Sequence, residues 1–134
     1  MKYHILKIII LYHLKLIMNN KTIIAWVDDI ETSARLLKLV ADNFYDIEFL
    51  NELELVKRVD ARVLIVDLNC INEFDLQSLM KYKKNNFFIL LGFIKELSAD
   101  LINYHTSLGC DIVLQRKEFL NNLNSIVKKA FHAC

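Results

Sequence analysis

Carboxylate side chains follow two apolar runs of the sequence at positions where a bound cation could hold them together. Asp28 and Asp29 come directly after residues 23–27, and Asp67 directly follows residues 63–66. Carboxylates brought close together repel one another and raise each other's proton affinity unless a cation lies among them. Magnesium is the natural candidate, because it takes oxygen ligands and keeps part of its water shell. The three aspartates therefore predict a magnesium site, provided that the fold brings the ends of the two runs together.

The elements that would position these aspartates alternate between short apolar runs and helical periodicity. Strands are predicted over residues 23–27, 47–50, 63–66, 87–91 and 111–115, and helices over 30–44, 53–59, around 76–80, 97–108 and 119–131. This order is typical of a parallel sheet flanked by helices. Ligands of such sheets bind beyond the carboxyl ends of the strands, near the point where the strand order reverses. We therefore expect the three carboxylates to meet there, beside Arg116 and Lys117, which follow the fifth strand.

Length and composition indicate one globular domain. The chain has 134 residues, of which 54% are hydrophobic, enough for one substantial core but hardly for two. Seventeen basic and 16 acidic side chains leave a net charge of +1, so the charge balance does not indicate a nucleic-acid partner. The three cysteines lack the spacing of a zinc site or a disulfide framework, which favours ordinary thiols in a reducing, cytoplasmic setting.

The first 17 residues differ in pattern from the rest of the chain. Lys7, His13 and Lys15 interrupt their apolar runs, so no stretch reaches the roughly 18 to 20 apolar residues that a membrane span needs. We expect residues 1–17 to be an extension outside the domain and residues 18–134 to form the domain. An amphipathic helix lying on the domain or on a membrane surface is the alternative for the extension.

Three segments together resemble the marks of response-regulator receiver domains. They are Val-Asp-Asp at residues 27–29 before a helix, Val-Asp-Leu-Asn at residues 66–69, and Gly-Cys-Asp at residues 109–111 leading into the last strand. The resemblance covers nearly all of residues 21–131. It implies an α/β, flavodoxin-like three-layer sandwich, with a five-stranded parallel sheet in the order 2-1-3-4-5 and helices on both faces.

The same resemblance implies a role for each matching residue. Asp67 matches the phosphate-accepting aspartate, and Asp28 and Asp29 match the acidic pair that holds Mg²⁺. The backbone carbonyl of Asn69 would be a further metal ligand, with Asp67 itself completing the protein ligands. Asp67 would attack a phosphoryl group in line, while the metal and a basic side chain neutralise charge on the equatorial oxygens.

The sequence departs from the receiver pattern at the positions that usually couple phosphorylation to output. In these departures it resembles an atypical branch of stand-alone receivers. The hydroxyl residue expected at the end of the fourth strand aligns with Gly92, and the aromatic switch residue of the fifth strand aligns with Val113. The lysine after the fifth strand aligns with Arg116, whose planar guanidinium does not replace a compact ammonium in a tight pocket. A shift of one residue would place Lys117 there instead.

These departures leave other functions open. A pseudo-receiver would act only as a protein-interaction module, and its partner binding would survive Asp67→Ala. A magnesium-dependent phosphohydrolase of the haloacid-dehalogenase type would need a second aspartate two residues after the first, but Ile30 and Glu31 stand at those positions. A glycine-rich nucleotide-binding loop is excluded because the chain has only two glycines.

The receiver interpretation also implies partners. A sensor histidine kinase or a phosphotransfer protein would supply the phosphoryl group, and the domain itself would signal rather than act as an enzyme. Only three residues follow Phe131, so we expect output to pass to a downstream protein or through a homodimer. By resemblance, the output surface would comprise the helix at 97–108, the strand at 111–115 and the helix at 119–131, without direct binding of nucleic acid.

Overall fold

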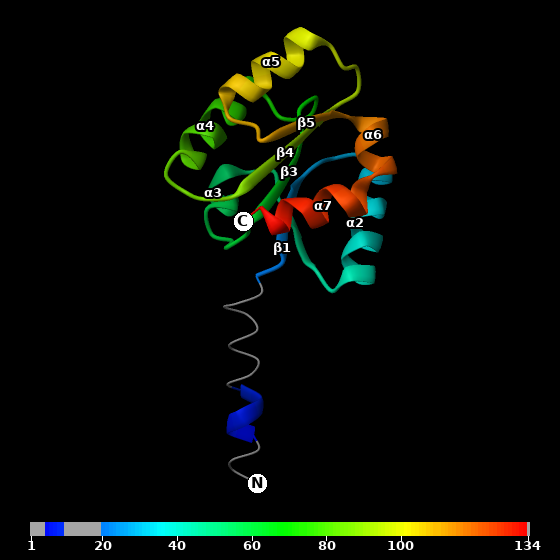
Figure 1. The fold of residues 1–134 in the computed structure, drawn as a ribbon. Helices are drawn as coiled ribbons and strands as arrows, with labels where there is room; N and C mark the ends of the chain where they lie inside the picture. Colours follow the sequence, from blue (N-terminus) through cyan, green and yellow to red (C-terminus); the bar gives the residue numbers. More distant parts are fainter. Residues whose placement is uncertain (1–4, 10–19, 134) are drawn as a thin grey trace.

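The computed structural model describes residues 5–9 and 20–133, and its core is a parallel sheet in the order β2-β1-β3-β4-β5 (Figure 1). The strands are β1 (Thr22–Trp26), β2 (Asp46–Phe49), β3 (Val63–Asp67), β4 (Ile89–Ile94) and β5 (Ile112–Gln115). The helices within residues 20–133 are α2 (Ile30–Asn43), α3 (Leu53–Val56), α4 (Glu73–Lys83), α5 (Ala99–Leu108), α6 (Arg116–Asn121) and α7 (Leu123–His132). The predicted fold class and strand order are confirmed.

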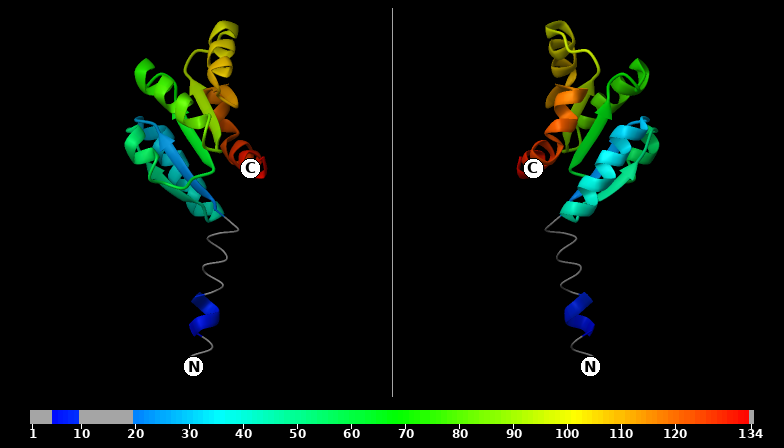
Figure 2. Two further views of the ribbon diagram at one scale, coloured as in Figure 1. Left: turned by 90° about the vertical axis from the view of Figure 1, so that its left-hand side faces the viewer. Right: turned by 90° about the vertical axis from the view of Figure 1, so that its right-hand side faces the viewer.

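Two apolar clusters cover the two faces of the sheet, because the side chains of a strand point alternately to opposite sides. Ile23 and Ile65 point to the face that packs against Leu36 of α2 and Val127 of α7. The intervening side chains, such as Leu64, point to the face covered by α3 and α4. In Figure 2, α4 (green) and α7 (red) accordingly lie on opposite sides of the strands. A sheet buried on both faces explains why its central strands are almost uniformly apolar.

Capping residues set the ends of α4 and α5. The Asn72 side chain accepts a hydrogen bond of 2.8 Å from the amide N–H of Asp75 at the start of α4. The Ser98 hydroxyl accepts one of 3.1 Å from the amide N–H of Leu101 at the start of α5. Gly109 ends α5 with φ 131°, a conformation that L side chains rarely adopt. These caps supply partners for backbone groups that would otherwise have none.

The fourth strand, the second helix and the last helix differ clearly from the prediction. β4 begins and ends later than expected, so Gly92 lies inside the strand and not at its end. Gly92 interrupts the apolar run from Phe87 to Ile94, but the strand continues through it, and Phe87 itself is exposed. The predicted last helix is two helices, α6 and α7, separated at Asn122, whose φ of −120° leaves helical geometry. The predicted second helix is shorter and ends at Val56.

Trp26 and His105 are two conspicuous side chains that both lie inside the packed domain. Trp26 is 3% exposed and belongs to the core. His105 is buried on the inner side of α5. Burial lowers the pKa of His105, since the charged imidazolium would lose its hydration. The imidazole is therefore a neutral part of the packing between α5 and its neighbours.

The predicted N-terminal extension falls mostly outside the described residues. Residues 5–9 are helical, and the side chains of Ile5, Leu6, Ile8 and Ile9 are exposed. The division between an extension at 1–17 and a domain at 18–134 therefore stays a prediction. Across residues 5–9 and 20–133, every helix is too short or too polar to cross a bilayer.

Candidate functional site

The register of the sheet brings the three predicted carboxylates to one edge. Trp26 of β1 pairs with Val66 of β3, so the two strands end almost level with each other. Asp67 is the last residue of β3, and Asp28 and Asp29 follow the end of β1. Both of these carboxylates are close enough to Asp67 for their negative charges to raise its pKa. The structure therefore juxtaposes Asp28, Asp29 and Asp67.

Asp67 lies in the least hydrated part of this edge, with 6% of its surface exposed. Its Oδ1 accepts a hydrogen bond of 2.9 Å from the amide N–H of Asn69. Burial is the main reason that the pKa of Asp67 is raised, and the charges of Asp29 and Asp28 add to the effect. The Asn69 N–H and the Lys95 ammonium act in the opposite direction but do not cancel it. The ionised form of Asp67 is therefore less favourable in this site than it would be in an exposed aspartate.

Asp29 is the cap of α2 and the centre of a charge network. Its Oδ2 accepts hydrogen bonds from the Thr32 amide N–H at 2.8 Å and from Arg116 Nη2 at 2.6 Å. Burial opposes ionisation of Asp29, but these bonds outweigh it and hold its pKa below the usual value. Its other oxygen, Oδ1, is buried without a hydrogen-bond partner. A buried carboxylate oxygen without a partner is free to accept a cation.

Arg116 points to Asp29 and Glu31 and not to Asp67, the expected phosphate acceptor. It begins α6, and its Nη2 lies 2.6 Å from Asp29 Oδ2 and 3.2 Å from Glu31 Oε2. No hydrogen bond or ion pair joins Arg116 to Asp67 within residues 5–9 and 20–133. Lys117 is exposed, and with Arg116 and Lys95 it lines a hollow of about 300 Å³ beside the site. The edge therefore carries a cationic wall next to the aspartates.

Sequence reasoning missed Lys95 and Glu31. Because the fourth strand was expected to end at residue 91, Lys95 did not stand out as a strand-end residue, although it follows the last strand residue directly. Glu31 lies in the first turn of α2, where a carboxylate is ordinarily explained by the helix dipole alone. A basic residue directly after an apolar run was the signal that could have identified Lys95.

The neighbouring strand offers Asp67 no hydroxyl group. Phe93 of β4 lies opposite Asp67 in the register, and Gly92 lies opposite Val66. Phe93 is fully buried, with its ring 5.0 Å from that of Phe119 in α6. A Cβ added to Gly92 would meet Cδ1 of Leu68 at 2.7 Å, which is closer than real Cβ contacts. The space that a Thr or Ser side chain would need at Gly92 is therefore occupied by Leu68.

The loop after β3 is tied to the loop after β4. The Asn69 side-chain oxygen accepts a hydrogen bond of 2.8 Å from the amide N–H of Lys95. Cys70, the next residue, contacts Asp28, and burial with the nearby carboxylates raises the pKa of its thiol to about 11. Cys70 is therefore a protonated thiol at neutral pH, in keeping with the prediction for this cysteine. The hydrogen bond between Lys95 and the Asn69 side chain holds the Asn69 backbone, and with it the Asn69 carbonyl oxygen, in place.

The donor types suit Mg²⁺, but the ligands are not gathered into a preformed centre. Within residues 5–9 and 20–133, no three acidic, histidine or cysteine side chains stand close enough together to hold a metal ion. Asp29 Oδ1 is nevertheless an unused buried oxygen, and Asp28 is exposed at the same edge. Oxygen donors with room for water are what Mg²⁺ requires. The residues therefore fit the ion by chemistry, with Arg116 as a competing cation already on Asp29.

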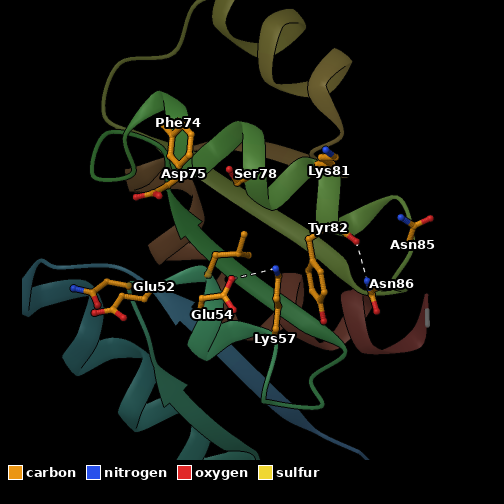
Figure 3. A pocket seen from close by; sticks show the side chains of 12 residues that line it. Glu52, Glu54, Lys57, Phe74, Asp75, Ser78, Lys81, Tyr82, Asn85 and Asn86 are labelled. Carbon is orange, nitrogen blue, oxygen red and sulfur yellow. Dashed lines mark hydrogen bonds and ion pairs between the residues drawn. The ribbon is translucent and has the colours of Figure 1, made fainter.

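A larger hollow, of about 640 Å³, lies between α3 and α4, away from these carboxylates (Figure 3). Glu54 and Lys57 pair across 3.2 Å on its α3 side, and Tyr82 and Lys81 line its α4 side. Phe74, near its rim, is 79% exposed. The lining carries both signs of charge, so it does not select a cation or an anion.

Comparison with solved structures identifies the architecture. A response regulator from Thermotoga maritima aligns with TM-score 0.72 at 15% identity, covering 84% of this chain and 98% of that chain. The BeF₃-activated receiver domain of Klebsiella pneumoniae RstA aligns with TM-score 0.71 at 10% identity, covering 82% and 97%. Vibrio cholerae chemotaxis protein CheY4 aligns with TM-score 0.68 at 15% identity, covering 81% and 97%. The chain has the fold of a response-regulator receiver domain.

The receiver fold is recognised here by shape and not by overall sequence. No family model matches the chain, and no curated protein matches it. The receiver fold nevertheless explains why the predicted site residues share one edge, because its strand order reverses between β1 and β3. The structural neighbours carry the name of a signalling domain, which is the class expected for this chain.

Replacement of Asp67 with asparagine is expected to stabilise this receiver fold at neutral pH. The pKa of Asp67 is raised in the folded chain, so its favourable contribution is complete below the unfolded pKa and is lost as pH rises through the folded pKa. Asparagine keeps an oxygen for the Asn69 N–H and removes the repulsion, a gain on the order of 1 kcal/mol. Urea unfolding should show this gain at pH 7 and little difference near pH 3. Equal free energies of unfolding for the parent and Asp67→Asn chains at both pH values would contradict this prediction.

Proposed function

We propose that this chain is a receiver-type signalling domain in which Asp67 accepts a phosphoryl group. The observation that carries the proposal is the placement of Asp67 at the end of β3, beside the carboxylates of Asp28 and Asp29. The Asn69 amide N–H engages Oδ1 of Asp67, which leaves Oδ2 for attack on phosphorus. A new O–P bond forms as the bond to the donor's leaving group breaks, and the electron pair departs with that group.

The surrounding residues have separate tasks in this proposal. Asp28 and Asp29, with Asp67 and the Asn69 carbonyl, would hold Mg²⁺, which supplies positive charge to the equatorial phosphoryl oxygens. Lys95 and Lys117 line the adjoining hollow and attract the anionic donor. Arg116 keeps Asp29 ionised. The nucleophile itself must lose its proton, and the raised pKa of Asp67 makes this loss less favourable than for an exposed aspartate, so the reactive ionised fraction increases as pH rises.

The phosphoryl donor in this proposal is a sensor histidine kinase or a phosphotransfer protein of the cytoplasm. The downstream partner, or a second copy of the chain, would bind the surface formed by α5, β5 and α7. Leu97, Leu101 and Tyr104 lie along this side of the fold with 36% to 42% of their surfaces exposed. Because Val113 replaces an aromatic switch residue, a different relay must connect Asp67 with that surface.

A second candidate function is a pseudo-receiver that binds a partner without phosphorylation. The Arg116–Asp29 ion pair favours it, because the cation already neutralises part of the acidic cluster. The packing of Leu68 into the space beside Gly92 points in the same direction, since no hydroxyl can bind a phosphoryl oxygen there. Partner binding that is unchanged by Asp67→Ala would select this function.

Beryllofluoride distinguishes the two functions, since it mimics a phosphoryl group on an ionised aspartate. In the presence of Mg²⁺, we expect it to shift the backbone NMR signals of Asp67, Asn69 and Lys95. Asp67→Asn should abolish these shifts because its side chain lacks the second carboxylate oxygen. Glu54→Gln, at the α3 hollow, is the matched control and should retain them. Unchanged spectra of the parent chain would exclude the phosphoacceptor function.

A further inference from the structure

A basic hollow lies at the end of the sheet opposite the three aspartates. It has a volume of about 410 Å³, and the segments before β1 and β3, the α2–β2 connection and α7 contribute its walls. Its lining comprises Asn20, Lys21, Asn43, Tyr45, Arg62, Asn124, Lys128, Phe131 and His132. Among residues 20–133, no aspartate or glutamate contributes to this lining. The hollow thus combines several cationic groups with asparagine side chains and one phenol.

The cations come from elements that are far apart in the sequence. Lys21 precedes β1, Arg62 precedes β3, and Lys128 lies on α7. Bringing like charges together costs free energy unless an opposite charge is present. The ion pairs found in residues 20–133 do not include Lys21 or Lys128. Within residues 20–133, the fold therefore assembles positive charge here without an acidic side chain that pairs with either lysine.

Helix-end electrostatics explains only part of this arrangement. α2 and α7 both end near the hollow, and a cation such as His132 is favourable in the last turn of a helix. Lys21 and Arg62 lie outside the helices, at the starts of strands, where no such dipole requires them. A second role for the cluster is therefore indicated.

Two aromatic side chains, Tyr45 and Phe131, line the hollow together with the cations. The rings of Tyr45 and Phe131 lie 5.0 Å apart, and Lys21 Nζ lies 5.6 Å from the centre of the Tyr45 ring. Tyr45 is 8% exposed, and burial raises the pKa of its hydroxyl, which keeps it a neutral donor. A neutral hydroxyl donates a hydrogen bond to an anion without adding charge of its own.

We infer that this hollow binds the phosphate group of a phosphomonoester, held by Lys21, Lys128 and Arg62. A compact dianion would pair with the two lysines and offers enough oxygens for donors contributed by three elements. Tyr45 and the asparagines line the remaining wall. The site is separate from Asp67, because it lies at the amino ends of the strands and Asp67 lies at a carboxyl end. The phosphate could be carried by a soluble metabolite or by a lipid headgroup, which present the same chemistry.

Titration with inorganic phosphate tests the site directly. The experiment follows backbone NMR signals of the Asp67→Asn chain without Mg²⁺, at constant ionic strength maintained with chloride. We expect saturable shifts at Lys21, Tyr45 and Lys128. Lys128→Ala should weaken the affinity about tenfold, the usual effect of losing one charged hydrogen bond. Lys129→Ala, one residue along the same helix and outside the lining, removes the same charge and should leave the affinity unchanged.

A vesicle experiment separates the two sources of phosphate. Phosphatidylcholine vesicles with and without phosphatidic acid are sedimented with the full chain and with its Lys128→Ala variant. Binding that requires phosphatidic acid and Lys128 assigns a lipid headgroup, whereas phosphate titration without vesicle binding assigns a soluble phosphomonoester. Equal weakening by Lys128→Ala and Lys129→Ala, or no saturable shift and no vesicle binding, would overturn the inference. Either result leaves the proposal for Asp67 unaffected.

Discussion

Phe119→Ala is expected to lower the free energy of unfolding by about 3 to 5 kcal/mol, the range found when a buried aromatic side chain is truncated. Phe119 is fully buried, and its ring stacks on Phe93 at a centroid distance of 5.0 Å and an interplanar angle of 14°. It thereby attaches α6, which begins at Arg116, to the strand that lies opposite Asp67. Urea unfolding followed by circular dichroism measures the loss.

Two variants make this stability test specific. Phe119→Leu retains most of the apolar volume and should recover a large part of the loss. Phe74→Ala removes the same ring from a position on α4 that is 79% exposed, and its effect should stay within about 0.5 kcal/mol. A Phe119→Ala chain as stable as the Phe74→Ala chain would show that the Phe93–Phe119 contact does not hold α6 in place.

Arg116→Gln is expected to strengthen Mg²⁺ binding about tenfold, which corresponds to about 1.4 kcal/mol. The guanidinium lies 2.6 Å from Asp29 Oδ2 and competes with a divalent ion for the same carboxylate. Its removal should also raise the pKa of Asp29, because one of the hydrogen bonds that favour the ionised form is lost. Isothermal titration calorimetry with Mg²⁺ at constant ionic strength measures the affinity.

Arg35→Gln is the matched control for the magnesium experiment. Arg35 lies on α2 and is 3.9 Å from Glu31, so its removal deletes the same charge near the same network without touching Asp29. Its exposed ion pair should contribute little. If Arg116→Gln leaves the Mg²⁺ affinity unchanged or reduces it, Arg116 does not compete with the metal and the interpretation of the Asp29 ion pair is wrong.

The sequence was sufficient to predict the sheet and the edge of it at which the three aspartates lie. Continuous apolar strands separated by helical periods require a parallel sheet, and parallel strands place their carboxyl ends on one edge. The placement of Asp28, Asp29 and Asp67 at that edge therefore follows from their positions directly after strands. The caps at Asn72 and Ser98 were also predictable, because each satisfies backbone N–H groups within its own first turn.

The direction in which charged side chains point could not be predicted in this way. Arg116 was expected beside Asp67, but it binds Asp29 and Glu31, since a long side chain at the start of α6 can reach more than one carboxylate. The end of β4 was also mispredicted, because Gly92 looked like the end of the strand although the strand continues through it to Ile94. That error concealed Phe93 and Lys95 as the neighbours of Asp67.

Intact-mass spectrometry of the chain after incubation with acetyl phosphate and Mg²⁺ tests the central claim most directly. The account predicts a population heavier by one phosphoryl group, which is absent without Mg²⁺ and absent from the Asp67→Asn chain. The Glu54→Gln chain, altered at the α3 hollow, should gain the same mass as the parent. Failure of the folded parent chain to gain this mass, or an equal gain by Asp67→Asn, would contradict the assignment of Asp67 as the phosphate acceptor.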